Sequence, residues 1–263
     1  MIYHFHNLYS HLGDCVLSLK FFYNIRNILR DKDICIHFYY IEEHLHSSIK
    51  ELQHYACPNV IILLPHTNCP KESYDCWAGH DIDGIHYSNW ELYFEAHYKK
   101  IIQILQLEDC GIDYSLWQPE EYLLERYQTL PDTYKSIDIL VINSIAYSSQ
   151  YNRDPKEMDD LCTFLNQSYS IATTRKVEGI RCTMDMDLRI QDIAAIATHC
   201  KYIIAIHTGP LCPLFNKQTK EHVKKWVFIV TNGLHPVCYN INYDMISDGN
   251  LDGIYQYFRD TVE

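Results

Sequence analysis

The chain lacks the features that mark several broad protein classes. Its 263 residues contain no apolar run close to the roughly 20 residues that a membrane-spanning helix needs, so we expect no transmembrane segment. Basic residues are few: 22 Lys and Arg stand against 34 Asp and Glu, which gives a formal charge of -12. This charge argues against a general nucleic-acid binder, whose affinity comes from basic contacts to phosphate. A local basic pocket for a phosphorylated ligand is compatible with it.

Two further absences concern the start of the chain and its cysteines. The first dozen residues hold three histidines and no basic, apolar-flanked stretch, so we expect no signal peptide. The 11 cysteines are odd in number and form no CxxC pair. This pattern favours free thiols in a reducing compartment over a disulfide framework, and we expect a cytoplasmic protein.

The sequence does contain a regular alternation of strand and helix patterns. In the first half these patterns lie at residues 2–6, 15–29, 34–39, 42–55, 60–64 and 90–107. After a charged, proline-containing interruption they restart at residues 137–143, 156–167, 169–173, 188–199, 201–206 and 226–231. Helices of this length between strands imply right-handed βαβ crossovers and parallel sheets.

The interruption predicts two domains. We expect a compact α/β protein with an N-terminal Rossmann-like domain at 1–115, a linker at 116–136 and a C-terminal Rossmann-like domain at 137–250. A final amphipathic pattern at 251–263 predicts a C-terminal helix. Both halves place a polar cluster after a strand, where open parallel sheets bind ligands, so we expect two sheets that face one cleft.

Three stretches of sequence share the order of a known family's motifs. LGDCVLSL at 12–19 is similar to an opening segment GDvvlt, and LRIQDIAAIA at 188–197 is similar to a helix that precedes a strand and a DTGpmH motif. CKYIIAIHTGPL at 200–211 supplies that strand and motif. In these stretches the chain resembles the heptosyltransferase-like glycosyltransferases of the GT-B fold.

The resemblance implies a function for each half. The N-terminal half would bind an acceptor, a saccharide or a lipid-linked molecule, and the C-terminal half would bind a nucleotide-sugar donor. The reaction would be sugar transfer without metal or cofactor, with peripheral membrane association where the acceptor is lipid-linked. The C-terminal helix would pack back on the N-terminal half.

The first motif supplies the catalytic and acceptor-binding candidates. Sugar transfer needs a base for the acceptor hydroxyl, and Asp14, next to Gly13 at the tip of the first strand, is the candidate. Gly13 would allow the acceptor to approach the backbone closely. His6 and His11 flank this loop and could bind sugar hydroxyls. Alternatively, Asp14 only caps a helix that begins at Cys15.

The second motif supplies the donor-binding candidates. Thr208, Gly209 and Pro210 form a sharp exit from a strand, where free N–H groups attract phosphate, and an ordinary βα turn is the alternative. His207 stands where relatives usually have Asp, and Cys212 where many have His, so the donor's identity does not carry over. Cations are also needed to hold the diphosphate. The candidates are Arg175 and Lys176, which follow the strand pattern at 169–173 and could alternatively belong to a solvated loop.

Other readings remain open from the sequence. The His and Cys residues between 66 and 86 suggest zinc, but the seven-residue spacing of Cys69 and Cys76 fits a zinc site poorly, and we expect no metal. A catalytically inactive GT-B-like protein that binds nucleotide or sugar is one alternative function, and a nucleotide-sugar epimerase is another. A Rossmann oxidoreductase is disfavoured because no GxGxxG follows the first strand.

Overall fold

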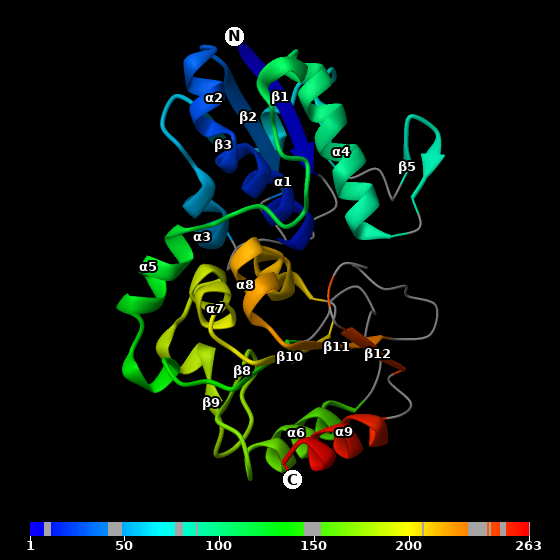
Figure 1. Ribbon diagram of the computed structural model, residues 1–263. Coiled ribbons are helices and arrows are strands. Elements are labelled where there is room, and N and C mark those ends of the chain that lie inside the picture. The colour runs from blue at the N-terminus through cyan, green and yellow to red at the C-terminus, as the bar shows by residue number, and fades with distance from the viewer. Residues whose placement is uncertain are drawn as a thin grey trace. The chain divides into compact units, whose positions relative to one another are not determined.

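The chain folds into two compact α/β units, Met1–Gln118 and Pro119–Glu263 (Figure 1). The computed structural model describes residues 1–7, 12–41, 49–76, 81–87, 89–144, 154–206, 208–230, 241, 243–247 and 251–262. Each unit is built on its own parallel sheet, as the alternation of strand and helix patterns predicted.

The first unit holds a four-stranded parallel sheet in the order β3-β2-β1-β4. The central strand β1 (Ile2–Asn7) pairs with β2 (Cys35–Tyr40), which pairs with β3 (Ile61–Pro65). The chain then returns to the other side of β1, where the short β4 (Tyr74–Asp75) completes the sheet. This reversal creates a topological switch point between β1 and β4, where ligands bind in open parallel sheets.

Aromatic side chains hold helices against one face of this sheet. Phe5 of β1 lies 4.8 Å, between ring centroids, from Phe22 of α1 (Leu12–Asn24). Phe21 stacks at 4.1 Å on Tyr98 of α4 (Trp90–Leu105), and the Tyr98 hydroxyl donates to the Leu17 carbonyl at 3.0 Å. The remaining elements of this unit are α2 (Arg26–Asp31), α3 (Ile49–Leu52), the antiparallel pair β5 (Asp81–Ile82) and β6 (Ile85–His86), and the short turns η1 (Gln53–Tyr55), η2 (His66–Asn68) and η3 (Glu108–Cys110).

The opposite face of the first sheet is rich in histidine. Side chains alternate along a strand, so His4 and His6 point away from Phe5 and share a face with His37 and Tyr39 of β2. The rings of His4 and His37 lie 5.3 Å apart, and His4 Nδ1 lies 3.1 Å from the Tyr39 hydroxyl. His4 and His6 therefore lie on the same face of β1.

The second unit holds a six-stranded parallel sheet in the order β12-β11-β10-β7-β8-β9. Its strands are β7 (Ile139–Ile142), β8 (Ile171–Thr173), β9 (Arg181–Cys182), β10 (Tyr202–Ile206), β11 (Lys225–Val230) and β12 (Tyr243–Ser247). From β7 the chain runs outward through β8 and β9, then returns to the other side of β7 and runs outward through β10, β11 and β12. A second switch point therefore lies between β7 and β10.

Helices cover both faces of the second sheet (Figure 1). On one face α6 (Pro155–Leu165) and α9 (Asp252–Val262) pack against a buried apolar cluster of strand residues. On the other lie α7 (Ile190–Ala197), which is buried along its whole length, and α8 (Lys217–His222). A short turn, η6 (Gly209–Leu214), follows β10, and Phe215 after it stacks on Trp226 of β11.

The C-terminal helix differs from the expectation drawn from the family. Ile254 and Phe258 of α9, one helical turn apart, are 1% exposed and belong to the same apolar cluster as Leu161 of α6. The prediction that this helix packs on the N-terminal half is therefore wrong. Its narrow apolar stripe is buried on the sheet of its own unit, against the apolar face of α6.

The segment between the two repeating patterns is part of the second unit's packing. It holds α5 (Tyr122–Thr129) and the turn η4 (Asp132–Tyr134). Arg126 of α5 donates from Nε to Asp192 of α7 at 2.6 Å, and the Tyr134 hydroxyl donates to the Cys182 carbonyl at 2.6 Å. These contacts tie α5 and η4 to the second unit.

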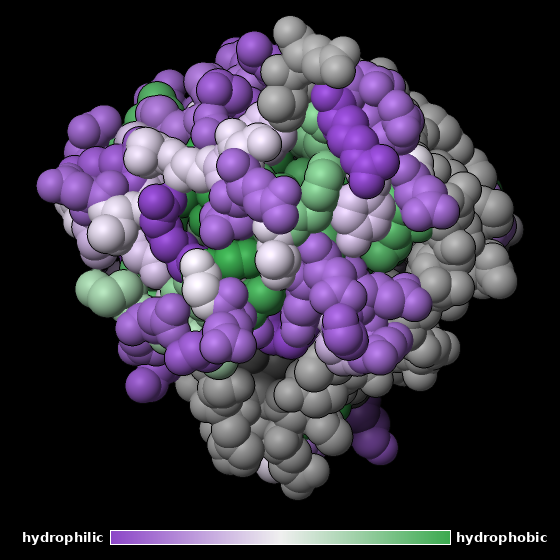
Figure 2. Space-filling model, turned by 90° about the horizontal axis from the view of Figure 1, so that it is seen from below, coloured by the Kyte–Doolittle hydropathy of each residue, from purple (hydrophilic) through white to green (hydrophobic). Residues whose placement is uncertain are grey.

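The described cysteines and helices show no disulfide and no membrane-spanning segment. The ten cysteines that the structure describes are all free, and in the first unit Cys35, Cys57, Cys69 and Cys110 are partly exposed, while the others are buried. Among the described helices, none has both the length and the apolar character needed to cross a bilayer. Among the residues drawn in colour in Figure 2, hydrophilic side chains surround a smaller hydrophobic area.

Candidate active site

The switch point of the first sheet places Asp14 at the start of α1. The helix begins at Leu12, so Asp14 is its third residue, and Gly13 before it is buried. The alternative role of Asp14 as the cap of a helix starting at Cys15 is wrong, because α1 already contains the residues before it. Neither Leu12 nor Gly13 is a strong helix-start signal, which is why the sequence pattern placed the start too late.

The environment of Asp14 changes its acidity. Burial raises the pKa of the Asp14 carboxyl from 3.8 to about 7. A helix N-terminus favours an ionised carboxylate, so the desolvation penalty outweighs the helix dipole here. Within the described residues, no hydrogen bond or ion pair holds the Asp14 side chain. Burial and the Asp14 charge together raise the pKa of the Cys15 thiol beyond its usual range. Asp14 is thus a carboxyl that can exchange a proton near neutral pH.

His6 lies at the carboxyl end of β1, directly opposite Asp75 of β4. Its Nδ1 is 2.8 Å from Ser73 Oγ, and its Nε2 is 3.8 Å from Asp75 Oδ1. Burial lowers the pKa of His6, and the Asp75 charge opposes that shift. Sequence analysis missed Ser73 and Asp75, because a two-residue strand in a polar loop leaves no periodic pattern.

The switch point of the second sheet is built around a buried amide. Asn143, which follows β7 and is 2% exposed, accepts at Oδ1 from the backbone N–H groups of Thr174 at 3.0 Å and Arg175 at 2.8 Å. The Thr174 hydroxyl oxygen in turn accepts from the N–H groups of Asn143 at 3.0 Å and Ser144 at 3.1 Å. This network holds the ends of β7 and β8 together. This network was not predicted from the sequence, although Asn143 ends one strand pattern and Thr174 directly follows another.

Thr208 presents an unused hydroxyl at the same edge. It precedes η6 with an extended backbone and makes no capping hydrogen bond through its side chain. Its Oγ1 is buried and has no hydrogen-bond partner among the described residues. Gly209 and Pro210 form the first residues of η6, as the sharp exit predicted. A buried hydroxyl without a partner costs free energy, which a ligand oxygen would recover.

Arg175 and Lys176 are already engaged within the protein. Arg175 follows β8, and its guanidinium forms an ion pair with Asp159 of α6 and donates to the Pro155 carbonyl at 3.3 Å. Lys176 is exposed, and its Nζ lies 3.6 Å from Asp185 Oδ1. Both cations therefore have carboxylate partners in this structure, and a role in holding a diphosphate stays a prediction.

Two of the predicted site residues cannot be placed. His11 and His207 lie outside the described residues, and so do parts of the loops beside them. Cys212, which stands where many relatives have His, is buried inside η6. Among the described side chains, no group of three or more His, Cys, Asp or Glu is arranged to hold a metal ion.

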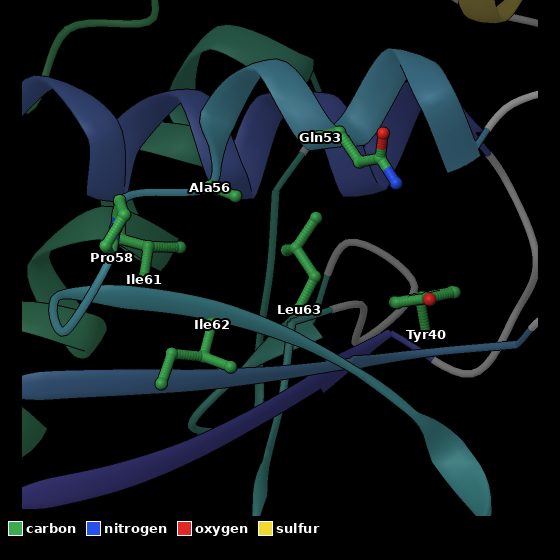
Figure 3. Close-up of a pocket in the computed structure, with 7 residues that line it drawn as sticks. All are labelled: Tyr40, Gln53, Ala56, Pro58, Ile61, Ile62 and Leu63. Atoms are coloured by element: carbon green, nitrogen blue, oxygen red, sulfur yellow. The ribbon is translucent and has the colours of Figure 1, made fainter.

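An apolar pocket of about 330 Å³ lies at the β3 edge of the first sheet (Figure 3). Its wall is formed by Tyr40, Gln53, Ala56, Pro58, Ile61, Ile62 and Leu63. Tyr40 is the last residue of β2 and pairs in register with Asn7, so one end of the pocket reaches the carboxyl edge of the sheet. The lining contains no carboxylate or histidine, so the pocket suits an apolar group.

Solved structures of glycosyltransferases resemble this chain over nearly its whole length. A glycosyl transferase family 9 protein from Veillonella parvula DSM 2008 aligns with 97% of this chain and 90% of its own, with a TM-score of 0.53 and 11% identity. The E. coli heptosyltransferase WaaC with ADP-2-deoxy-2-fluoro heptose aligns with 99% of this chain and 100% of its own, with a TM-score of 0.54 and 9% identity. The structure of the same enzyme with ADP aligns with 99% of this chain and 97% of its own, with a TM-score of 0.53 and 9% identity. No protein-family model and no curated protein matches the sequence.

At such low identity these matches concern the fold. Each covers 90% or more of both chains, and each is a glycosyltransferase. The predicted α/β architecture with two Rossmann-like halves is confirmed. The chain has the fold of the heptosyltransferase-like glycosyltransferases, the family that its sequence motifs resemble.

Proposed function

We propose that this protein is a glycosyltransferase that moves a sugar from a nucleotide-sugar donor to a hydroxyl of a saccharide or lipid-linked acceptor. The proposal depends on Asp14. This residue lies at the switch point of the first sheet, and its carboxyl has a pKa of about 7. A base that titrates near neutral pH is about half ionised at pH 7 and still strong enough to accept a proton in the transition state. The shared glycosyltransferase fold supports the reaction class.

The reaction balances with one base and one leaving group. Asp14 takes the proton of the acceptor hydroxyl while that oxygen forms a bond to the anomeric carbon of the donor sugar. The bond between that carbon and the diphosphate breaks, and the nucleoside diphosphate leaves with the electron pair. Stabilising the negative charge on the leaving diphosphate requires hydrogen-bond donors or cations close to it.

We assign the donor to the carboxyl edge of the second sheet. The Thr208 hydroxyl, which has no partner among the described residues, would donate to a phosphate oxygen, and Gly209 and Pro210 would allow close approach. His207, Arg175 and Lys176 complete the proposed donor site. The solved WaaC structures contain ADP or an ADP-sugar analogue, which supports a nucleotide-sugar as the donor class.

We propose that the transfer proceeds without a metal. The described groups at the second switch point are amides, hydroxyls and backbone N–H groups, such as Asn143, Thr174 and Thr208. Magnesium in sugar-nucleotide and phosphate sites is usually held by carboxylates. Hydrogen-bond donors would therefore take over the stabilisation of the diphosphate. Activity that survives EDTA supports this assignment, and loss of activity on chelation contradicts it.

We assign the acceptor to the first unit. Gly13 would allow an acceptor to approach the backbone beside Asp14, and His6 and His11 would bind acceptor hydroxyls. The apolar pocket that ends at Tyr40 supports a lipid-linked acceptor, which would bring the protein to a membrane surface. The free thiols support a reducing compartment, and we place the reaction in the cytoplasm.

The test compares Asp14→Asn with Asp31→Asn, an exposed carboxylate of α2 in the same unit. Release of nucleoside diphosphate from a panel of nucleotide-sugars, measured with a panel of saccharide and lipid-linked acceptors, should fall by about 10² or more in Asp14→Asn, because a general base contributes that much. ADP affinity should not change in either variant, and Asp31→Asn should keep the wild-type rate.

Other outcomes would identify a different function. A near-wild-type rate in Asp14→Asn would remove the base assignment. Nucleotide binding without release under any condition would indicate an inactive binding protein. Conversion of the donor sugar without nucleotide release would indicate an epimerase.

A further inference from the structure

The apolar pocket of the first unit has two chemically different ends. Tyr40, the last residue of β2, lies at the carboxyl edge of the sheet, whereas Pro58 belongs to the turn that precedes β3 at the amino edge. In Figure 3 the Leu63 side chain points from β3 toward the helical turn that carries Gln53. The pocket therefore lies between the edge strand and that turn, and runs from one edge of the sheet toward the other.

A cation lies beside the amino-edge end of the pocket. Arg30 of α2 is exposed, and its Nη2 donates to the Cys57 thiol sulfur at 3.8 Å. Cys57 stands between the lining residues Ala56 and Pro58. It also exchanges backbone hydrogen bonds of 2.8 and 3.0 Å with Ile61, which fixes the turn. The guanidinium is therefore held at the rim of the pocket, next to a fixed turn.

No carboxylate among the described residues pairs with Arg30. Its other side-chain contact runs from Nη1 to Asn27 Oδ1 at 3.4 Å, and this partner is also neutral. Lys99 of α4, by contrast, lies 2.6 Å from a carboxylate oxygen of Glu95. Acidic residues outnumber basic ones in this chain, so an arginine that pairs with none of them is available to an external anion.

We infer that this pocket binds a single-chain fatty acid, with the alkyl chain against the apolar wall and the carboxylate on Arg30. The guanidinium presents a planar fork of N–H groups that matches the two oxygens of a carboxylate. The pocket volume of about 330 Å³ is near the lower end for ligand pockets, which suits one short chain and not two. The inference goes beyond the proposed function, because the fatty acid would occupy the place of an acceptor's lipid part and exclude it.

The test measures binding of octanoate, 1-octanol and octylamine by calorimetry at pH 7 and low salt. Octanoate should bind about three- to fivefold more tightly than 1-octanol, because an ion pair at an exposed arginine contributes roughly that ratio. Octylamine, which is a cation, should bind more weakly than either. Added salt should reduce the preference for octanoate, since it screens exposed charges. Ala56→Trp, which fills the pocket from its exposed rim, should weaken the binding of all three.

Two arginines of α2 separate a local from a general charge effect. Arg30→Gln should remove the preference for octanoate over 1-octanol and keep the binding of 1-octanol. The matched control is Arg26→Gln, which removes the same charge from the same helix and should keep the preference. The Arg26 guanidinium lies 4.0 Å from the ring centroid of Tyr23 and donates to the Tyr23 carbonyl at 2.6 Å.

Four results would overturn the fatty-acid site. They are equal binding of octanoate and 1-octanol by the wild-type protein, an undiminished preference in Arg30→Gln, an equal loss of preference in Arg26→Gln, and unchanged octanoate binding in Ala56→Trp. Circular dichroism of each variant shows that it is folded. None of these measurements requires turnover, so the result is independent of whether the protein transfers a sugar.

Discussion

The carboxyl edges of the two sheets have the same topology and different chemistry. In both sheets the chain runs outward on one side of the first strand and then returns to the other side, which creates a switch point. At the first switch point lie three titratable side chains, Asp14, His6 and Asp75. Between β7 and β10 at the second switch point lie the neutral Asn143 amide and Thr208 hydroxyl, and the cations that follow β8, Arg175 and Lys176, have carboxylate partners.

This difference matches the two tasks of a transferase. Proton transfer needs a group that changes charge near neutral pH, and the first edge provides it at the cost of burying a carboxyl. Binding a leaving group that is already charged needs hydrogen-bond donors held in fixed positions. The Asn143 and Thr174 network provides that rigidity without any titratable group. The comparison therefore supports the proposal that proton transfer takes place at the first unit and anion binding at the second.

The largest effect is expected in the pH dependence of the transfer rate, which tests whether the first edge carries the proton chemistry. If Asp14 is the base, kcat/KM should rise about tenfold per pH unit well below pH 7 and level off above it, so its value at pH 5 should be about 50-fold below that at pH 7. A pH–rate profile at acceptor concentrations far below KM measures kcat/KM. A profile that stays flat from pH 5 to 7 would contradict the assignment.

The stability of the fold should also depend on the ionisation of Asp14, but it should fall as pH rises, whereas kcat/KM should increase. The folded-state pKa of about 7 lies above the ordinary value of 3.8, so the folded protein binds more protons between these values. The contribution of Asp14 to the free energy of unfolding should therefore decrease as pH rises from about 4 to 7. Asp14→Asn should melt higher than wild type at pH 8 and similarly at pH 4, in thermal unfolding followed by circular dichroism.

The next effect concerns the rigidity of the second edge. Asn143→Ala leaves the N–H groups of Thr174 and Arg175 buried without their acceptor, which should lower the free energy of unfolding by roughly 2 to 4 kcal/mol. Urea unfolding measures the change. The matched control is Asn166→Ala, at the exposed end of α6, which should cost less than about 0.5 kcal/mol. Similar losses for both variants would remove the special role of Asn143.

A smaller effect should separate binding from stability at Thr208. Thr208→Val keeps the shape of the side chain and removes a hydroxyl that has no partner among the described residues, so stability should stay equal or rise slightly. ADP affinity should fall by about 1 to 2 kcal/mol, and Thr208→Ser should retain it. Calorimetric titration with ADP decides the matter. Equal ADP affinity in Thr208→Val and Thr208→Ser would place the diphosphate elsewhere.

The smallest effect is expected at Arg175. Its ion pair with Asp159 joins partly exposed side chains, so a double-mutant cycle of Arg175→Gln and Asp159→Asn should give a coupling of about 1 kcal/mol or less. Since binding a diphosphate would require Arg175 to leave Asp159, Arg175→Gln should weaken ADP binding by less than about fivefold. A much larger loss of ADP affinity would show that Arg175 provides most of the charge at the second edge.

The fold was predictable where sequence patterns are local. Strongly apolar strands such as β7 and β10 and the polar residues after them follow from composition and period. Asp14 and Thr208 were therefore identified from their positions at strand ends. The chemistry around them was not predictable in the same way. The pKa of Asp14 depends on burial by parts of the chain distant in sequence, which no local pattern records.

Contacts between distant residues account for the features that the sequence analysis missed. The β4 strand exists only because it pairs with the end of β1, and without it Asp75 and His6 would not meet. Arg175 has a counter-ion because α6 places Asp159 beside it. The sequence of α9 shows that it has an apolar stripe but not which surface covers that stripe. In the structure the stripe packs against α6 and the second sheet.

The distribution of the cysteines makes the two units chemically distinguishable to a thiol reagent. The partly exposed described cysteines, Cys35, Cys57, Cys69 and Cys110, all belong to the first unit, whereas those of the second are buried. Burial also raises the pKa of the Cys162 thiol to about 12, which leaves almost no reactive thiolate at neutral pH. Among the described cysteines, a maleimide dye would therefore label the first unit and leave the second unit dark. A fluorescent nucleotide could then serve as the second colour in an energy-transfer measurement.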